Sequence, residues 1–184
     1  KQIISSIIST RKPFGISTRI REKKKGIYKL ISSEGIGYLD KGDFIDNCGW
    51  VNQYKVLISK VTAEHAGEPD RNGMFRVISR MELLEPFDLC TDSYLVIGGS
   101  KTKKNVISVY KYLRCKFARF MLMLAVSSIN LSREKFQFVP LQDFTSQSDI
   151  DWSVSIPEID EQLYQKYGLS DDEIAFIEKM IKPM

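Results

Sequence analysis

The sequence predicts a mixed α+β fold, in which a strand-rich N-terminal sheet domain packs on one long amphipathic helix and a C-terminal helical pair follows. Three observations lead to this prediction. Short segments rich in β-branched residues, separated by turn-forming glycines, occupy most of the first hundred or so positions. Apolar residues then recur at helical spacing over residues 103–127. Proline, glycine and serine signals of two further helices lie within residues 146–184.

The predicted strands are short and are bounded by turn residues. After an apolar stretch near the N-terminus, Pro13 and Gly15 break the chain, and Gly35 supplies the first turn between strands. The polar segment 62–73 is expected to be a loop that can touch a ligand. The segments expected to be strands are Gly26–Ser32, Ile36–Leu39, Tyr54–Val61, Phe75–Ile78 and the apolar, central Ser93–Gly98.

The predicted helices follow from periodicity and from end signals. Residues 103–127 carry one apolar stripe, from Val106 to Leu124, which predicts a single long helix with its stripe in the core. Pro157 begins the next helix, and Gly168 is suited to end it. The segment Ser170–Glu173 has the pattern of a capping box before the last helix, which Pro183 is expected to stop. The expected domains are residues 1–145 and a helical appendage, 146–184.

The charge of the chain is modest overall but unevenly distributed. The formal net charge is +4. The segment from Lys1 to Leu30 contains nine lysine or arginine residues and one acidic residue. The segment from Lys101 to Arg119 contains seven basic residues and no acidic residue. Residues 149–178 hold nine acids and one lysine. This asymmetry favours a basic face for a polyanion and an acidic end that faces elsewhere, the alternative being ordinary solvated surfaces.

The sequence argues against most kinds of catalytic chemistry. The single histidine, His65, excludes a multi-histidine zinc site and has no partner for a nucleophilic triad. Pro69–Asp70 is not followed by the acid-x-Lys element of a metal-dependent nuclease, and Gly98–Lys101 lacks Walker A spacing. No glycine-rich cofactor loop or Pro-Pro-aromatic element of a methyltransferase occurs either. We therefore expect no metal site and no catalytic residue in this chain.

The remaining composition indicates an intracellular protein. Three cysteines, Cys48, Cys90 and Cys115, have no metal-ligand spacing and are expected to be reduced, small apolar residues. No run of apolar residues is long enough for a membrane helix, and no secretory signal opens the chain. The expected location is the cytoplasm, with no membrane partner.

Five segments resemble one family of enzymes, in the order in which the family has them. They are Ser5–Gly15 (SSIISTRKPFG), Leu89–Gly98 (LCTDSYLVIG), Tyr112–Leu124 (YLRCKFARFMLML), Leu131–Phe144 (LSREKFQFVPLQDF) and Glu161–Met184 (EQLYQKYGLSDDEIAFIEKMIKPM). Together they resemble the C-terminal target-recognition (specificity) region of TaqI-like, type IIG restriction–modification adenine-specific DNA methyltransferases. Residues 19–80 match least, and this is where such families vary because each member reads a different site.

The resemblance implies a division of labour. Residues 1–145 would bind double-stranded DNA sequence-specifically, and the N-terminal methyltransferase domain of the same polypeptide would bind S-adenosylmethionine and methylate adenine. The chain itself would need no cofactor. The parent would be a bacterial cytoplasmic enzyme, with or without a fused restriction endonuclease. The alternative is an interaction module that docks the methylase or restriction subunit without reading DNA.

Candidate DNA-binding residues follow from charge and from base chemistry. Lysine and arginine neutralise phosphates, and Gly15 and Gly26 would let the backbone approach the duplex. Arginine suits guanine, and asparagine or glutamine suits adenine. The expected phosphate contacts are Arg11, Lys12, Arg19, Arg21, Lys23, Lys24, Lys25, Lys101, Lys103 and Lys104. The candidates for base readout are Asn47, Asn52, Gln53, Arg71, Asn72 and Arg76.

Overall fold

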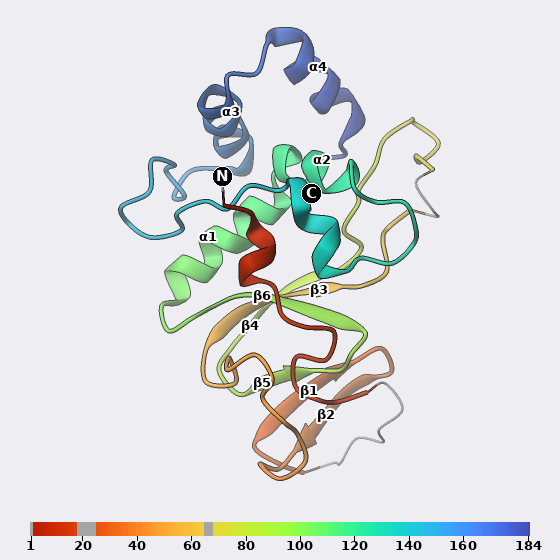
Figure 1. Cartoon of the computed structure of the whole chain (residues 1–184), viewed down its shortest axis with the longest axis vertical. Helices are drawn as coiled ribbons and strands as arrows, with labels where there is room; N and C mark the ends of the chain where they lie inside the picture. The colour runs from red at the N-terminus through yellow and green to blue at the C-terminus, as the bar shows by residue number, and fades with distance from the viewer. Residues whose placement is uncertain (1, 18–24, 65–67) are drawn as a thin grey trace.

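The strands lie within residues 28–100 and the α-helices within residues 103–180 (Figure 1), which confirms the mixed α+β class. The computed structural model describes residues 2–17, 25–64 and 68–184. Within them the strands are β1 (Tyr28–Ser32), β2 (Gly35–Leu39), β3 (Tyr54–Ser59), β4 (Met81–Leu84), β5 (Asp88–Cys90) and β6 (Tyr94–Ser100). The helices are η1 (Ile4–Ile7), α1 (Lys103–Arg114), α2 (Lys116–Met123), η2 (Arg133–Phe138), α3 (Ile156–Tyr167) and α4 (Asp171–Met180).

The strands form two three-stranded sheets. The first has the order β2-β1-β5, with β1 and β2 antiparallel and β1 and β5 parallel. Its hairpin turn is closed by Ser32, whose hydroxyl donates to the Gly35 carbonyl at 3.0 Å and accepts the Glu34 N–H at 3.1 Å. The second sheet has the order β4-β3-β6 and is antiparallel throughout.

Strand β3 lies between two hydrophobic cores. Val56, Leu57 and Ile58 are all fully buried. Side chains of a strand alternate between its faces, so Leu57 points into the core shared with the first sheet while Val56 and Ile58 point toward the helices. Figure 1 shows the result: the helices lie on one side of the β4-β3-β6 sheet and the β2-β1-β5 sheet lies on the other.

The prediction of a single long helix over residues 103–127 is wrong. The helix breaks at Cys115, whose backbone is extended (ψ 144°), and α2 then begins at Lys116. The cause is Asp160 of α3, whose carboxylate accepts the N–H groups of Lys116 and Phe117, each at 2.9 Å. This carboxylate caps α2. Most of the apolar stripe is buried or half-buried, but Leu124 at its end is 55% exposed, and the stripe is shared between two helices.

The C-terminal helical pair has the predicted ends. Pro157 lies in the first turn of α3, and Gly168 ends that helix with φ 65°. Ser170 and Glu173 form the capping box of α4, which ends at Met180, three residues before Pro183. The pair contributes Ile159 and Leu163 to the same core as Tyr112 and Phe117 of α1 and α2. One core therefore extends across the expected domain boundary at residues 145 and 146.

Three strand assignments differ from the expectation. Phe75–Ile78 is not a strand, because Val77 adopts φ 70° and turns the chain, leaving only single bridges from Phe75 to Ile181 and from Ile78 to Thr62. Strands β4 and β5 were not predicted, since four and three residues carry little periodicity. The polar segment 62–73 is a loop in its described part, as predicted. No described helix has both the length and the apolar character needed to cross a membrane.

Candidate nucleic-acid interface

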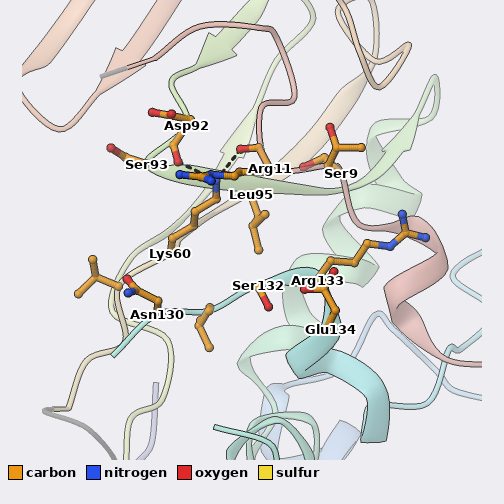
Figure 2. Close-up of a pocket in the computed structure, with 13 residues that line it drawn as sticks. Ser9, Arg11, Lys60, Asp92, Ser93, Leu95, Asn130, Ser132, Arg133 and Glu134 are labelled. Atoms are coloured by element: carbon orange, nitrogen blue, oxygen red, sulfur yellow. Dashed lines mark hydrogen bonds between the residues drawn. The ribbon is translucent and has the colours of Figure 1, made fainter. Parts of the chain in front are cut away.

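A groove of about 820 Å³ lies where the N-terminal segment, the end of β3 and the start of β6 meet the segment that leads into η2. Three cationic residues from three of these segments line it: Arg11, Lys60 and Arg133. Figure 2 shows them around the groove together with hydroxyl and amide side chains. The other lining residues are Ser9, Thr10, Val61, Asp92, Ser93, Leu95, Asn130, Leu131, Ser132 and Glu134.

Strand β6 positions the first wall of the groove. Ser9 donates its N–H to the Val96 carbonyl at 2.9 Å, and its hydroxyl accepts the Val96 N–H at 3.0 Å. The N-terminal segment is therefore fixed along β6 two residues before Arg11. Beyond it, the amide of Asn47 donates to the Lys12 carbonyl at 2.8 Å, which fixes the chain on the other side. The exposed Arg11 and Lys12 are thus carried by a segment held at both ends.

Lys60 joins two walls of the groove. Its ammonium donates to the Arg11 carbonyl and, at 2.7 Å, to the Asp92 carbonyl (Figure 2). Burial lowers the pKa of Lys60, the charge of Asp92 opposes that shift, and the positive charge of Arg11 adds to it. Lys60 therefore ties the Arg11 segment to the start of β6 and also adds positive charge to the groove.

The opposite wall is the segment from Asn130 to Glu134. It is attached to the end of β3, because the Leu131 N–H donates to the Lys60 carbonyl at 2.6 Å and Asn130 bridges Val61. Arg133 is exposed, and Figure 2 shows its guanidinium directed away from Lys60. The groove also contains carboxylates, at Asp92 and Glu134, so its charge is mixed with a cationic excess.

The expected phosphate contacts fall into separate places. Arg11 lines the groove, Lys12 follows it, and Lys25 is exposed just before β1. Arg19, Arg21, Lys23 and Lys24 lie outside the described residues. Lys101, Lys103 and Lys104 lie at the far end of β6 from the groove. That strand has seven residues, so the separation is about 20 Å.

The three lysines near the start of α1 differ in whether a described neighbour offsets their charge. Lys103 forms an ion pair with Glu85 at 2.6 Å and lies over the Tyr54 ring, 5.6 Å from its centroid. Lys104 lines another cavity, of about 410 Å³, together with Asp149 and Asp151. Lys101 is exposed and makes no hydrogen bond or ion pair with the residues that the structure describes. Of these three lysines, Lys101 is the one whose charge no described neighbour offsets.

The candidates for base readout lie at the two ends of β3, a six-residue strand that spans about 17 Å. Asn47, Asn52 and Gln53 precede the strand; Asn47 holds Lys12, and Gln53 donates to the Gly49 carbonyl at 3.2 Å. The exposed Asn52 makes no side-chain hydrogen bond within the described part of the chain.

Arg71, Asn72 and Arg76 belong to the loop that follows β3. Arg71 and Asn72 lie in a turn whose shape is set by Asp70, which accepts the N–H groups of Asn72 at 2.9 Å and Met74 at 3.0 Å. Arg76 lines a different cavity from that of Arg11. The six candidates therefore do not form one surface.

Sequence reasoning missed two of the three cations of the groove. Lys60 is the second-last residue of the predicted strand Tyr54–Val61, where it carried no functional signal. Arg133 lies in the family-like segment LSREKFQFVPLQDF, so attention to the charged residues of that segment would have found it. Comparisons with family models, curated proteins and solved structures found no match. Among the residues that the structure describes, no cluster of His, Cys, Asp and Glu could hold a metal ion.

Proposed function

We propose that this chain is the DNA target-recognition part of an adenine-specific DNA methyltransferase of the TaqI-like, type IIG kind. The observation that carries the proposal is the groove that Arg11, Lys60 and Arg133 line from three segments of the chain. The resemblance of five sequence segments to that family supplies the reaction and the partner domain. The chain recognises the duplex, and the methyltransferase domain of the parent provides S-adenosylmethionine and the chemistry.

In this proposal the groove binds the sugar–phosphate backbone. Guanidinium groups form paired hydrogen bonds with phosphate oxygens, so the exposed Arg11 and Arg133 are the main contacts. Hydroxyl groups of Ser93 and Ser132 line the same groove and donate to phosphate as well. Lys60 positions the Arg11 segment. Such contacts fix the register of the protein on the duplex but carry no sequence information.

Base recognition falls to side chains with free hydrogen-bonding groups. Asn52 remains the best placed of the predicted residues before β3, because Asn47 and Gln53 are engaged with backbone carbonyls. Asn130 is a further candidate, since it lines the groove on the Lys60 side (Figure 2). A target adenine inside a duplex must be rotated out of the stack before methylation, so the enzyme needs a part that holds the surrounding DNA.

The proposal is tested by duplex binding as a function of salt. Fluorescence anisotropy with a pool of random 20-base-pair duplexes measures the phosphate contribution, which does not depend on the recognised site. Each phosphate that the protein no longer neutralises reduces the slope of log K against log salt by about 0.9. We expect Arg11→Gln and Arg133→Gln each to reduce the slope by about this amount, and the double variant by about twice as much.

The matched control is Lys179→Gln, which removes one exposed positive charge on α4, outside the groove. It is expected to leave the slope unchanged. Two results would instead support the alternative, a module that docks the methylase or restriction subunit without reading DNA. One is duplex binding that does not depend on salt concentration, and the other is an equal decrease of binding in all variants.

A further inference from the structure

A cavity of about 350 Å³, which we call the second cavity, lies between α1, the corner before β4 and the segment after α4. It is separate from the groove and from the cavity that Lys104 lines. Three cationic residues line it, one from each of these places: Arg114, Arg76 and Lys182. The remaining described residues of its wall are Met81, Tyr110, Pro183 and Met184, none of which has an acidic side chain. The cavity shares no lining residue with the groove.

The buried Arg119 of α2 brings the two arginines of the cavity together. Its side chain is 1% exposed. Its Nε donates to the Arg114 carbonyl and its Nη1 to the Arg76 carbonyl, both at 3.1 Å. One guanidinium thus holds both chain segments that present the arginines of the cavity. Its remaining nitrogen, Nη2, has no hydrogen-bond partner among the described residues.

The backbone corner that presents Arg76 is held in a strained form. Val77 has φ 70°, which is rare for a β-branched residue. The carboxylate of Glu64 accepts the N–H groups of Arg76 and, at 2.9 Å, of Val77. Together with Arg119 on the Arg76 carbonyl, these bonds fix the backbone from which the Arg76 side chain extends.

The positive charges around the cavity are only partly compensated. Lys182 forms an ion pair with Asp70 at 3.0 Å, and the Arg114 guanidinium lies over the Tyr110 ring, 5.5 Å from its centroid. The exposed Arg76 side chain makes no hydrogen bond or ion pair with the described residues. Burial lowers the pKa of Arg119 to about 10; the nearby positive charges of Arg114 and Arg76 add to that shift, while Asp160 opposes it.

A smaller cavity of about 170 Å³ adjoins the second one through Arg114, and Arg119 lines it. The two carboxylates there are already engaged. Asp160 caps α2, and Glu178 accepts hydrogen bonds from Lys116 and Tyr164. Neither carboxylate lines the larger cavity, and neither forms an ion pair with Arg76 or Arg114.

We propose that the second cavity is an anion site that takes one phosphate group, bound by Arg76 and Arg114 with Lys182 at its edge. Guanidinium groups match the oxygens of a phosphate in pairs, and the Arg76 and Arg114 side chains have no carboxylate partner among the described residues, which favours an anion between them. The phosphate comes either from free solution or from the DNA backbone. The site does not depend on the function proposed for the groove.

Thermal unfolding of the full chain in inorganic phosphate tests the site directly. Ionic strength is held constant with sodium chloride, so that general screening does not change. We expect a saturable rise in Tm, of about 3 to 5 °C at a phosphate concentration ten times Kd. Arg114→Gln and Arg76→Gln are expected to abolish the rise. Lys179→Gln, at an exposed position of α4 that lines neither the groove nor this cavity, is the matched control and is expected to keep it.

A second measurement identifies the source of the phosphate. If the site binds the DNA backbone, Arg76→Gln reduces the salt slope of duplex binding by about 0.9, and inorganic phosphate competes with the duplex. If it binds a free phosphate, duplex binding is unchanged while the Tm rise remains. The proposal is overturned if phosphate gives no saturable rise beyond sodium chloride, or if both variants keep that rise. Arg76→Gln carries the test if Arg114→Gln does not fold.

Discussion

Among the residues that the structure describes, two cationic side chains are buried, one at each of the two cores, and their hydrogen bonds differ. Lys55 of β3 lies beside the core of the first sheet, and Arg119 of α2 lies in the core of the helices. Lys55 donates to the carbonyls of Gln53 at 3.0 Å and Glu85 at 3.3 Å. Arg119 donates to two carbonyls in segments 38 positions apart, at Arg76 and Arg114.

The two residues differ in how firmly they keep their charge. Burial lowers the pKa of Lys55 to about 8, whereas that of Arg119 falls only to about 10. A lysine in an apolar region can give up its proton near neutral pH, but a guanidinium stays charged. The comparison indicates that the charge of Lys55 depends on pH near 8, and that Arg119 is a permanent cation connecting two segments.

The largest effect is expected for Arg119→Leu. The substitution removes the two hydrogen bonds that the Arg119 guanidinium donates, so the carbonyls of Arg76 and Arg114 lose their donor. The free energy of unfolding is expected to fall by about 3 to 5 kcal/mol. Urea denaturation at pH 7 measures it. Arg119→Lys, which keeps the charge but reaches only one carbonyl, is the intermediate control. A loss below about 1 kcal/mol for Arg119→Leu would mean that the connection between the segments adds little.

Lys55→Met is expected to act through pH more than through stability at pH 7. The pKa of Lys55 is depressed from 10.5 to about 8. The native chain therefore gains up to about 3 kcal/mol as pH rises from 8 to 10.5, and loses that gain as pH falls through 8. The variant lacks this rise, and at pH 7 its stability stays within about 1 kcal/mol of the native value. A pH series of urea midpoints for both chains checks the difference, and parallel curves would contradict it.

Asp160→Asn sharpens the comparison, because the charge of Asp160 raises the pKa of Arg119 and opposes the effect of burial. Burial raises the pKa of Asp160 from 3.8 to about 6, against the two backbone N–H groups that it accepts. Its stabilisation is complete below pH 3.8 and is lost as pH rises through 6, by on the order of 3 kcal/mol. The difference in stability between native chain and variant should change over pH 4 to 6. Gln165→Asn, at an exposed position of the same helix, is the control, because neither amide side chain titrates.

The smallest effect is expected at a helix end outside both cores. Ser170→Ala removes the side-chain cap that accepts the Glu173 N–H at 3.4 Å. The loss is about 1 kcal/mol. Chemical denaturation again measures it, and Ser146→Ala, in the loop before α3, is the neutral control. An equal effect of the two substitutions would show that the capping box does not contribute.

The parts of the fold that were predictable depend on neighbouring residues. Pro157 and Gly168 mark the ends of α3 by their own backbone preferences, and the capping box at Ser170 needs only Glu173. The break between α1 and α2 depends on Asp160, which lies 44 positions after Lys116. No local pattern contains that information.

The cationic residues of the groove were likewise predictable only in part. Arg11 was found because basic residues cluster near the N-terminus, but Lys60 and Arg133 reach it only through the packing of three distant segments. The same packing separates the predicted cations of α1 from the groove by the length of β6. Charge along the sequence therefore identified one cation of the groove, and the tertiary fold selected its partners.

The link between β4 and β5 has a mechanical consequence. Only Glu85, Pro86 and Phe87 separate the two strands, yet each strand belongs to a different sheet. Phe87 turns the chain with φ 69° and donates its N–H to the Val51 carbonyl at 2.8 Å, while Lys55 holds the Glu85 carbonyl. Because the connection is short and hydrogen-bonded, it limits how far one sheet can move relative to the other. A force on the β1–β2 hairpin would therefore pass through β5 and this link to β4 and β3.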